Sequence, residues 1–133
     1  GRLPRFRVLA GDDEKPVPDV LADLLRALGQ DVDVALGGAA GLERFEKGHY
    51  QVVFTDLSMP EVNGWDLTLA VKSRRPNVGV VVVTGWGLQL EEETAIAHGV
   101  DLLVAKPFSI EDLERALQRV GESLAVRGSG NGT

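Results

Sequence analysis

Five polar residues of this 133-residue chain stand at or just after the ends of four short apolar runs. Asp12 and Asp13 follow the first of these runs, and Asp56 follows the second. Thr84 ends the third and most apolar run, and Lys106 follows the last. Carboxylates are ligands for hard divalent cations, whereas an ammonium group and a hydroxyl suit phosphoryl oxygens. The residue types therefore indicate a metal-assisted phosphoryl site, provided that the fold brings these positions together.

The elements that must position these residues alternate between strands and helices. Apolar and partly β-branched runs predict strands over residues 6–10, 32–35, 51–55, 79–84 and 102–105. Apolar residues at helical spacing predict helices over residues 18–28, 39–47, 65–75, 91–98 and 109–126. This alternation predicts an α/β fold with one parallel sheet covered by helices on both faces.

The carboxyl-terminal part of the chain predicts a capped helix followed by a flexible segment. Ser109 and Asp112 form a pair typical of a capping box at the start of the last helix. The Gly- and Ser-rich residues 127–133 predict a flexible tail or linker. We therefore expect one folded domain over residues 5–126.

In such a sheet, chemistry collects beyond the carboxyl ends of the strands, where the strand order reverses. With the order 2-1-3-4-5, Asp12, Asp13 and Asp56 crowd into one crevice between the first and third strands. Three carboxylates so close together repel one another unless a cation joins them. Mg²⁺ takes oxygen ligands and commonly also meets a phosphate, so we expect Lys106 and Thr84 to face phosphoryl oxygens beside it.

Each of these residues also has a structural interpretation when taken alone. Asp12 or Asp13 is typical of a helix N-cap, and Asp56 of a turn. Thr84 is a common strand residue, and Lys106 is typical of a solvated surface. The functional interpretation is favoured because all five have fitting chemistry and fall on one edge of the same predicted sheet.

Composition narrows the classes of function. The net charge of −6 disfavours binding of nucleic acid or of an anionic membrane. The absence of cysteine excludes disulfides, cysteine-based zinc sites and thiol nucleophiles. No apolar run is long enough to span a bilayer, and no signal segment opens the chain, so we expect a cytoplasmic location.

Four sequence motifs in this order resemble the receiver domain of two-component response regulators and hybrid histidine kinases. They are Val-Leu-Ala-Gly-Asp-Asp-Glu at 8–14, Asp-Leu-Ser-Met-Pro-Glu-Val-Asn-Gly at 56–64, Val-Val-Val-Thr-Gly at 81–85 and Gly-Val-Asp-Leu-Leu-Val-Ala-Lys-Pro-Phe at 99–108. The resemblance covers residues 8 to about 120 and implies a flavodoxin-like fold.

The resemblance also implies roles for single residues. Asp56 would be the phosphoacceptor, which takes its phosphoryl group from a phosphohistidine, and it would also be a metal ligand. Asp13 would bind Mg²⁺ or Mn²⁺ directly, Asp12 would act through metal-bound water, and the backbone carbonyl of Ser58 would complete the protein ligands. Lys106 and Thr84 would hold the phosphoryl group, and the bond before Pro107 would be cis.

Two positions depart from the family pattern. Leu103 stands where most relatives carry an aromatic switch residue, so we expect the usual aromatic readout to be altered. Trp86 is unusually large for the segment after Thr84. It is either a surface tryptophan lying on the next helix or a lid that slows hydrolysis of the phosphoryl group.

Four functions are compatible with this architecture. A phosphorylation-dependent switch fits the full residue set, whereas a phosphorylation-independent interaction module would not need it. A phosphohydrolase would commonly carry a second acid where this chain has Ser58, so we expect no turnover of an external substrate. A flavin-binding domain would need Ser, Thr or Gly in the loop after the first strand to bind phosphate, whereas this loop has the carboxylates of Asp12 and Asp13.

The resemblance further implies the kinds of partner. The phosphoryl donor would be a sensor histidine kinase or a histidine phosphotransfer domain. The output would belong to a partner, or to a kinase or effector domain attached outside these residues. The last predicted helix is not followed by a helix-turn-helix, so we expect this domain not to bind DNA.

Overall fold

The computed structural model describes residues 4–12, 20–56, 64–84, 97, 99–105 and 108–131. For some residues at the ends of strands and helices, among them Asp12, Asp56 and Thr84, it describes the backbone alone. Statements about side chains below concern the remaining described residues.

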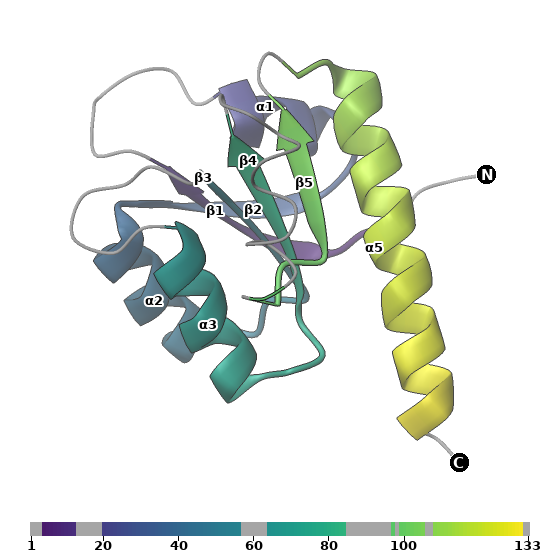
Figure 1. The fold of residues 1–133 in the computed structure, drawn as a ribbon. Coiled ribbons are helices and arrows are strands. Elements are labelled where there is room, and N and C mark those ends of the chain that lie inside the picture. The colour runs from purple at the N-terminus through teal and green to yellow at the C-terminus, as the bar shows by residue number, and fades with distance from the viewer. Residues whose placement is uncertain are drawn as a thin grey trace.

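Five parallel strands form one sheet in the order β2-β1-β3-β4-β5 (Figure 1). The strands are β1 (Arg7–Asp12), β2 (Asp31–Leu36), β3 (Val52–Asp56), β4 (Gly79–Thr84) and β5 (Leu102–Ala105). The predicted order is therefore confirmed. β1 runs through Asp12, two residues beyond its predicted end, because Gly11 and Asp12 still pair with β2.

Helices cover both faces of this sheet (Figure 1). The first pair is α1 (Val20–Ala27) with α5 (Ile110–Asn131), and the second is α2 (Gly38–Lys47) with α3 (Gly64–Arg74). Each pair packs on its own apolar cluster, one on either side of the sheet. Of the helix predicted over 91–98, only Ala97 lies within the described residues, and it is helical.

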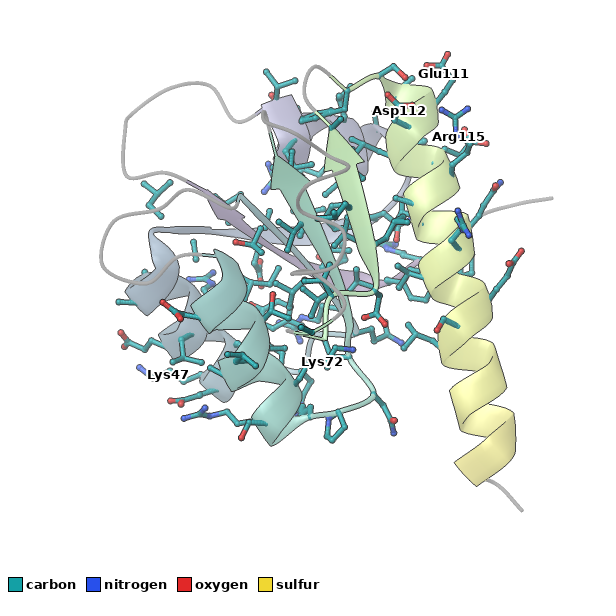
Figure 2. All side chains as sticks on the ribbon, in the orientation of Figure 1. Lys47, Lys72, Glu111, Asp112 and Arg115 are labelled. Carbon is teal, nitrogen blue, oxygen red and sulfur yellow. The ribbon has the colours of Figure 1, made fainter. Side chains whose placement is uncertain are left out.

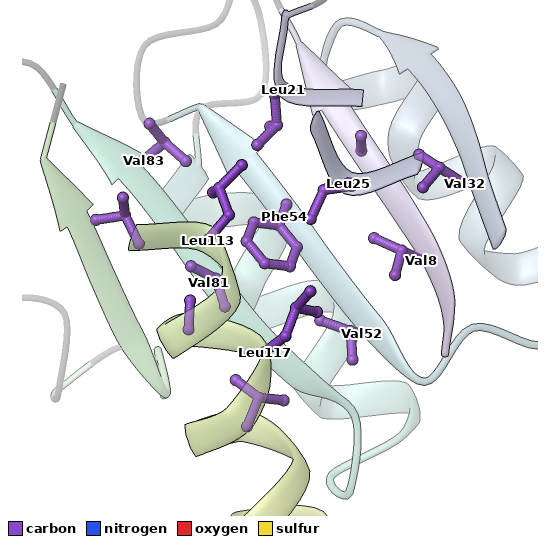
Figure 3. Close-up of a cluster of buried hydrophobic side chains, with 14 of the residues drawn as sticks. Val8, Leu21, Leu25, Val32, Val52, Phe54, Val81, Val83, Leu113 and Leu117 are labelled. Atoms are coloured by element: carbon purple, nitrogen blue, oxygen red, sulfur yellow. The ribbon is translucent and has the colours of Figure 1, made fainter. Parts of the chain in front are cut away.

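The cluster under α1 and α5 shows why the sequence folds this way (Figure 3). Phe54 of β3 is fully buried at its centre, between Leu25 of α1 and Leu113 and Leu117 of α5. Alternate residues of the central strands point to opposite faces, so continuous apolar runs such as β4 feed both clusters at once. This double burial holds β3 and β4, whose ends carry predicted site residues, in the middle of the sheet.

The start of α5 has the capping box that the sequence predicts. The backbone N–H of Asp112 donates to the Ser109 hydroxyl at 3.2 Å, and the backbone N–H of Ser109 donates to the Asp112 carboxylate at 2.9 Å. This second bond, from the backbone of Ser109, lowers the pKa of Asp112 below its usual range.

We therefore expect a pH-dependent contribution from Asp112 to the free energy of unfolding. A lowered pKa in the folded state means that the ionised carboxylate stabilises the fold above about pH 4, and that this gain is lost as the pH falls through the lowered pKa. An Asp112→Asn variant should be less stable than the parent at pH 7, with a gap that closes toward pH 3. Urea unfolding across this range measures it, and a gap that does not narrow contradicts the assignment.

Two helix details differ from the prediction. α5 continues to Asn131, whereas an end near residue 126 was expected. An established helix gains one hydrogen bond per added residue, so glycine lowers its stability by about 1 kcal/mol without forcing an end. The flexibility of residues 127–133 stays a prediction. Val20, placed by its spacing on the buried stripe of α1, is 57% exposed because it is the first residue of the helix.

Candidate functional site

The strand register brings the predicted site residues to one edge of the sheet. Gly11 of β1 lies opposite Thr55 of β3, so Asp12 and Asp56, each the next residue, end two neighbouring strands. Parallel neighbours lie about 4.8 Å apart, which puts the backbones of these two acidic residues side by side. Asp12 and Asp56 therefore end neighbouring strands, which is the backbone arrangement that the predicted crevice requires.

The same edge continues through the next two strands. Asp56 lies opposite Val83, so Thr84 ends β4 one residue further on. Thr84 lies opposite Ala105, the last residue of β5, and Lys106 follows it in the chain. Together with β1, four neighbouring strands therefore end in or directly before a candidate site residue.

The residues that precede the ends of β3 and β4 are buried in the core. Thr55, Phe54 and Val83 have almost no exposed surface, and they belong to the two central strands. Their packing holds the backbone at the ends of β3 and β4 in place. The chain thus positions the strand ends, through its core, before any ligand arrives.

The donor chemistry at this edge fits a magnesium ion. Mg²⁺ prefers oxygen ligands and is held in proteins by one or two carboxylates with waters. Asp12 and Asp56 supply two such residues at adjacent strand ends. Among the side chains that the structure describes, no group of three His, Cys, Asp or Glu could hold a metal ion.

Several predicted site residues lie outside the described residues. These are Asp13, Ser58, Trp86, Lys106 and Pro107. Leu103, the predicted switch position, is described: it is half-buried and packs against the apolar cluster on the α2–α3 side of the sheet. An aliphatic side chain therefore fills this position against the core.

One polar cluster lies away from the carboxyl edge, between β2 and α2. The Tyr50 hydroxyl donates to the Asp33 carboxylate at 2.6 Å, and the guanidinium groups of Arg7 and Arg44 lie 3.8 and 3.9 Å from the same carboxylate. Burial, and then this hydrogen bond to Asp33, raises the pKa of Tyr50 above its usual range. These residues line a hollow of about 440 Å³, and the Asp33 carboxylate lies between two guanidinium groups, whose charge is opposite to its own.

Sequence reasoning missed a second polar pair, formed by Lys72 and Asp101. Lys72 Nζ lies 2.8 Å from Asp101 Oδ2, and both side chains are mostly buried. A lysine in the last turn of a helix normally interacts with solvent and the helix dipole, so nothing in the local sequence pointed to this partner.

The comparison with known families identifies the class of this domain. A family profile described as the response regulator receiver domain matches residues 8–118. The chain therefore belongs to the receiver domain family, whose members are signalling modules of two-component systems.

Individual relatives agree with this assignment. The aerobic respiration control sensor protein ArcB of Escherichia coli is 32% identical over 120 residues, which are 88% of this chain and 15% of that protein. The sensory transduction protein RegX3 of Mycobacterium bovis is 31% identical over 113 residues, 85% of this chain and 49% of that protein. The chain thus spans less than half the length of these two relatives.

Solved structures show the same fold. The chemotaxis protein CheY4 of Vibrio cholerae is 27% identical with a TM-score of 0.79, and the match covers 88% of this chain and 99% of that one. The receiver domain of the sensor histidine kinase PA1611 from Pseudomonas aeruginosa is 27% identical with a TM-score of 0.78, covering 89% and 99%. That receiver domain holds a magnesium ion in its active site cleft.

In the ranges that the structure describes, no helix is both long and apolar enough to cross a bilayer.

Proposed function

We propose that this receiver domain is a phosphorylation-dependent switch in which Asp56 accepts the phosphoryl group in a Mg²⁺-dependent reaction. The observation that carries the proposal is the register that ends β1 and β3 side by side at Asp12 and Asp56. The magnesium ion in the cleft of the similar receiver domain from Pseudomonas aeruginosa supports the same metal here.

The transfer step moves the phosphoryl group from a histidine nitrogen to a carboxylate oxygen of Asp56. The donor is a phosphohistidine of a sensor kinase or of a histidine phosphotransfer domain. A carboxylate oxygen of Asp56 attacks phosphorus, the N–P bond breaks, and the imidazole keeps the electron pair and takes up a proton. The product is an acyl phosphate on Asp56. Mg²⁺, when bound, would neutralise charge on the phosphoryl oxygens during this step.

The residues around Asp56 have separate tasks in this scheme. Asp12 and Asp13 would hold the metal, Asp12 through a water, and the Ser58 backbone carbonyl would add a neutral oxygen ligand. Lys106 places a positive charge beside the phosphoryl oxygens, which favours their approach to a carboxylate. Thr84 donates a hydrogen bond to the phosphoryl group once it has formed.

Output follows from the position of Thr84 at the end of β4. A hydrogen bond from Thr84 to a new phosphoryl group draws the end of this strand toward Asp56, and a local charge event then favours one of two arrangements. Leu103, which lies opposite Val82 on the neighbouring strand, is placed to repack in response. A partner, or a kinase or effector domain outside these residues, would detect the change.

The test uses phosphoramidate, a small donor with the N–P bond of a phosphohistidine. Intact mass spectrometry should show one added phosphoryl group in the presence of Mg²⁺ and none after chelation with EDTA, because without the metal the acidic residues repel the donor. An adduct that forms equally well in EDTA contradicts the metal's role. A folded chain that gains no adduct with Mg²⁺ present contradicts the switch and favours a phosphorylation-independent interaction module.

A further inference from the structure

The Lys72–Asp101 pair joins three elements at the end of the sheet opposite the candidate site. Lys72 Nζ donates to Asp101 Oδ2 at 2.8 Å and to the Val78 carbonyl at 2.6 Å. The backbone N–H of Val80 donates to the same Asp101 oxygen at 2.7 Å. One carboxylate thus connects the last turn of α3, where Lys72 lies (Figure 2), with the first residues of β4 and the entry to β5.

Burial separates this pair from the other ion pairs among the described residues. The side chains of Lys72 and Asp101 are only 18% and 16% exposed, whereas Glu43 and Lys47, also paired, are 68% and 76% exposed. Exposed pairs contribute little to stability. Removing one partner of a buried pair leaves a charge without its counterion, so the structure around it must shift.

Asp101 stands at the entry to β5, which has few other strand contacts to hold it. This strand has only four residues and lies at the sheet edge, paired with β4 alone. Its register starts at Asp101, whose backbone N–H donates to the Val80 carbonyl at 2.9 Å. From there the ladder runs to Ala105 opposite Thr84, and Lys106 is the next residue.

We propose that Lys72 and Asp101 are positioning residues for phosphoryl transfer, because together they fix the register from which β5 delivers Lys106 to the carboxyl edge. The inference rests on the proposed function. A shift of about 1 Å in a charged group can cost about a hundredfold in rate. The hydrogen bonds described above join the pair to residues 78 and 80, whereas the predicted metal ligands lie on or next to β1 and β3, so we expect metal binding to be unaffected.

The experiment separates metal binding from phosphoryl transfer. Asp101→Ala, Lys72→Met and the double variant Lys72→Met/Asp101→Asn are compared with the parent. Asp33→Asn is the matched control, since Asp33 is also a partly buried carboxylate with a close donor but belongs to β2, at the other edge of the sheet. Lys72→Arg is the conservative variant. Calorimetry measures the Kd for Mg²⁺, and intact mass measures the rate of phosphorylation by phosphoramidate at saturating Mg²⁺.

We expect the two single variants to slow phosphorylation about tenfold or more. Their Kd for Mg²⁺ should stay within about twofold of the parent, as should both quantities in Asp33→Asn. Lys72→Arg should recover most of the rate. The double variant, which buries no unpaired charge, keeps the test valid if a single variant does not fold.

Three outcomes overturn the inference. One is an unchanged rate in the variants, and another is a parallel loss of rate and metal affinity, which would indicate general loosening. The third is amide hydrogen exchange that does not rise in residues 102–105, or that rises equally in β1 and β3. If the parent itself gains no phosphoryl group, the proposed function fails, and the exchange data still decide whether the pair holds β5.

Discussion

Replacing Asp56 by Asn is expected to abolish phosphorylation of this domain. Asn has nearly the same shape as Asp but no anionic oxygen, so it cannot form the acyl phosphate and is a weaker metal ligand. With Mg²⁺ and phosphoramidate, the variant should show less than about one hundredth of the parent's adduct, in line with the loss of a catalytic nucleophile.

Asp66→Asn is the matched control for this result. Asp66 is an exposed carboxylate in the first turn of α3 and belongs neither to the predicted metal ligands nor to the predicted phosphoryl-binding residues. Its variant should be phosphorylated at the parent's rate. An adduct that persists in Asp56→Asn would move the acceptor to another residue, with Asp12 and Asp13 the nearest alternatives.

The largest effect on stability is expected from Phe54→Ala. Phe54 is fully buried at the centre of the cluster between the sheet and α5. Truncating a buried phenylalanine costs about 3–5 kcal/mol, through the lost apolar transfer and the cavity that remains. Because small domains are stable by about 5–15 kcal/mol, the variant should unfold at a much lower urea concentration than the parent.

Leu69→Ala provides the comparison, since Leu69 of α3 is 48% exposed. Its cost should stay well below that of Phe54→Ala, because less apolar surface leaves the core. If both variants lose the same stability, or if Phe54→Ala loses less than about 1 kcal/mol, the described core is wrong.

Much of the fold could be predicted from the sequence because its patterns are local. β4 and β5 have the bounds expected from their β-branched and apolar runs, at 79–84 and 102–105. Ser109 and Asp112 make the capping box expected from their spacing. The strand order was also expected, because five strands alternating with helices leave few right-handed arrangements.

The remaining features depend on contacts between distant parts of the chain. Lys72 and Asp101 are far apart in sequence, and each has an ordinary local context, so no pattern pairs them before the strands are assembled. α5 was expected to end near residue 126, but a helix that is already formed extends through the Gly- and Ser-rich residues that follow. At the candidate site, the order of the elements predicted which strand ends meet, and the register of β1, β3, β4 and β5 supports that arrangement.

The most direct measurement identifies the phosphorylated residue in the unaltered chain. Borohydride reduces an acyl phosphate to an alcohol, which leaves homoserine in place of the modified aspartate. After phosphorylation with Mg²⁺ and phosphoramidate, peptide mass spectrometry should find homoserine at position 56 and at no other aspartate. Homoserine at position 12 or 13, or a phosphoryl group on His49 or His98 with none on Asp56, would contradict the account of this domain as an Asp56-dependent switch.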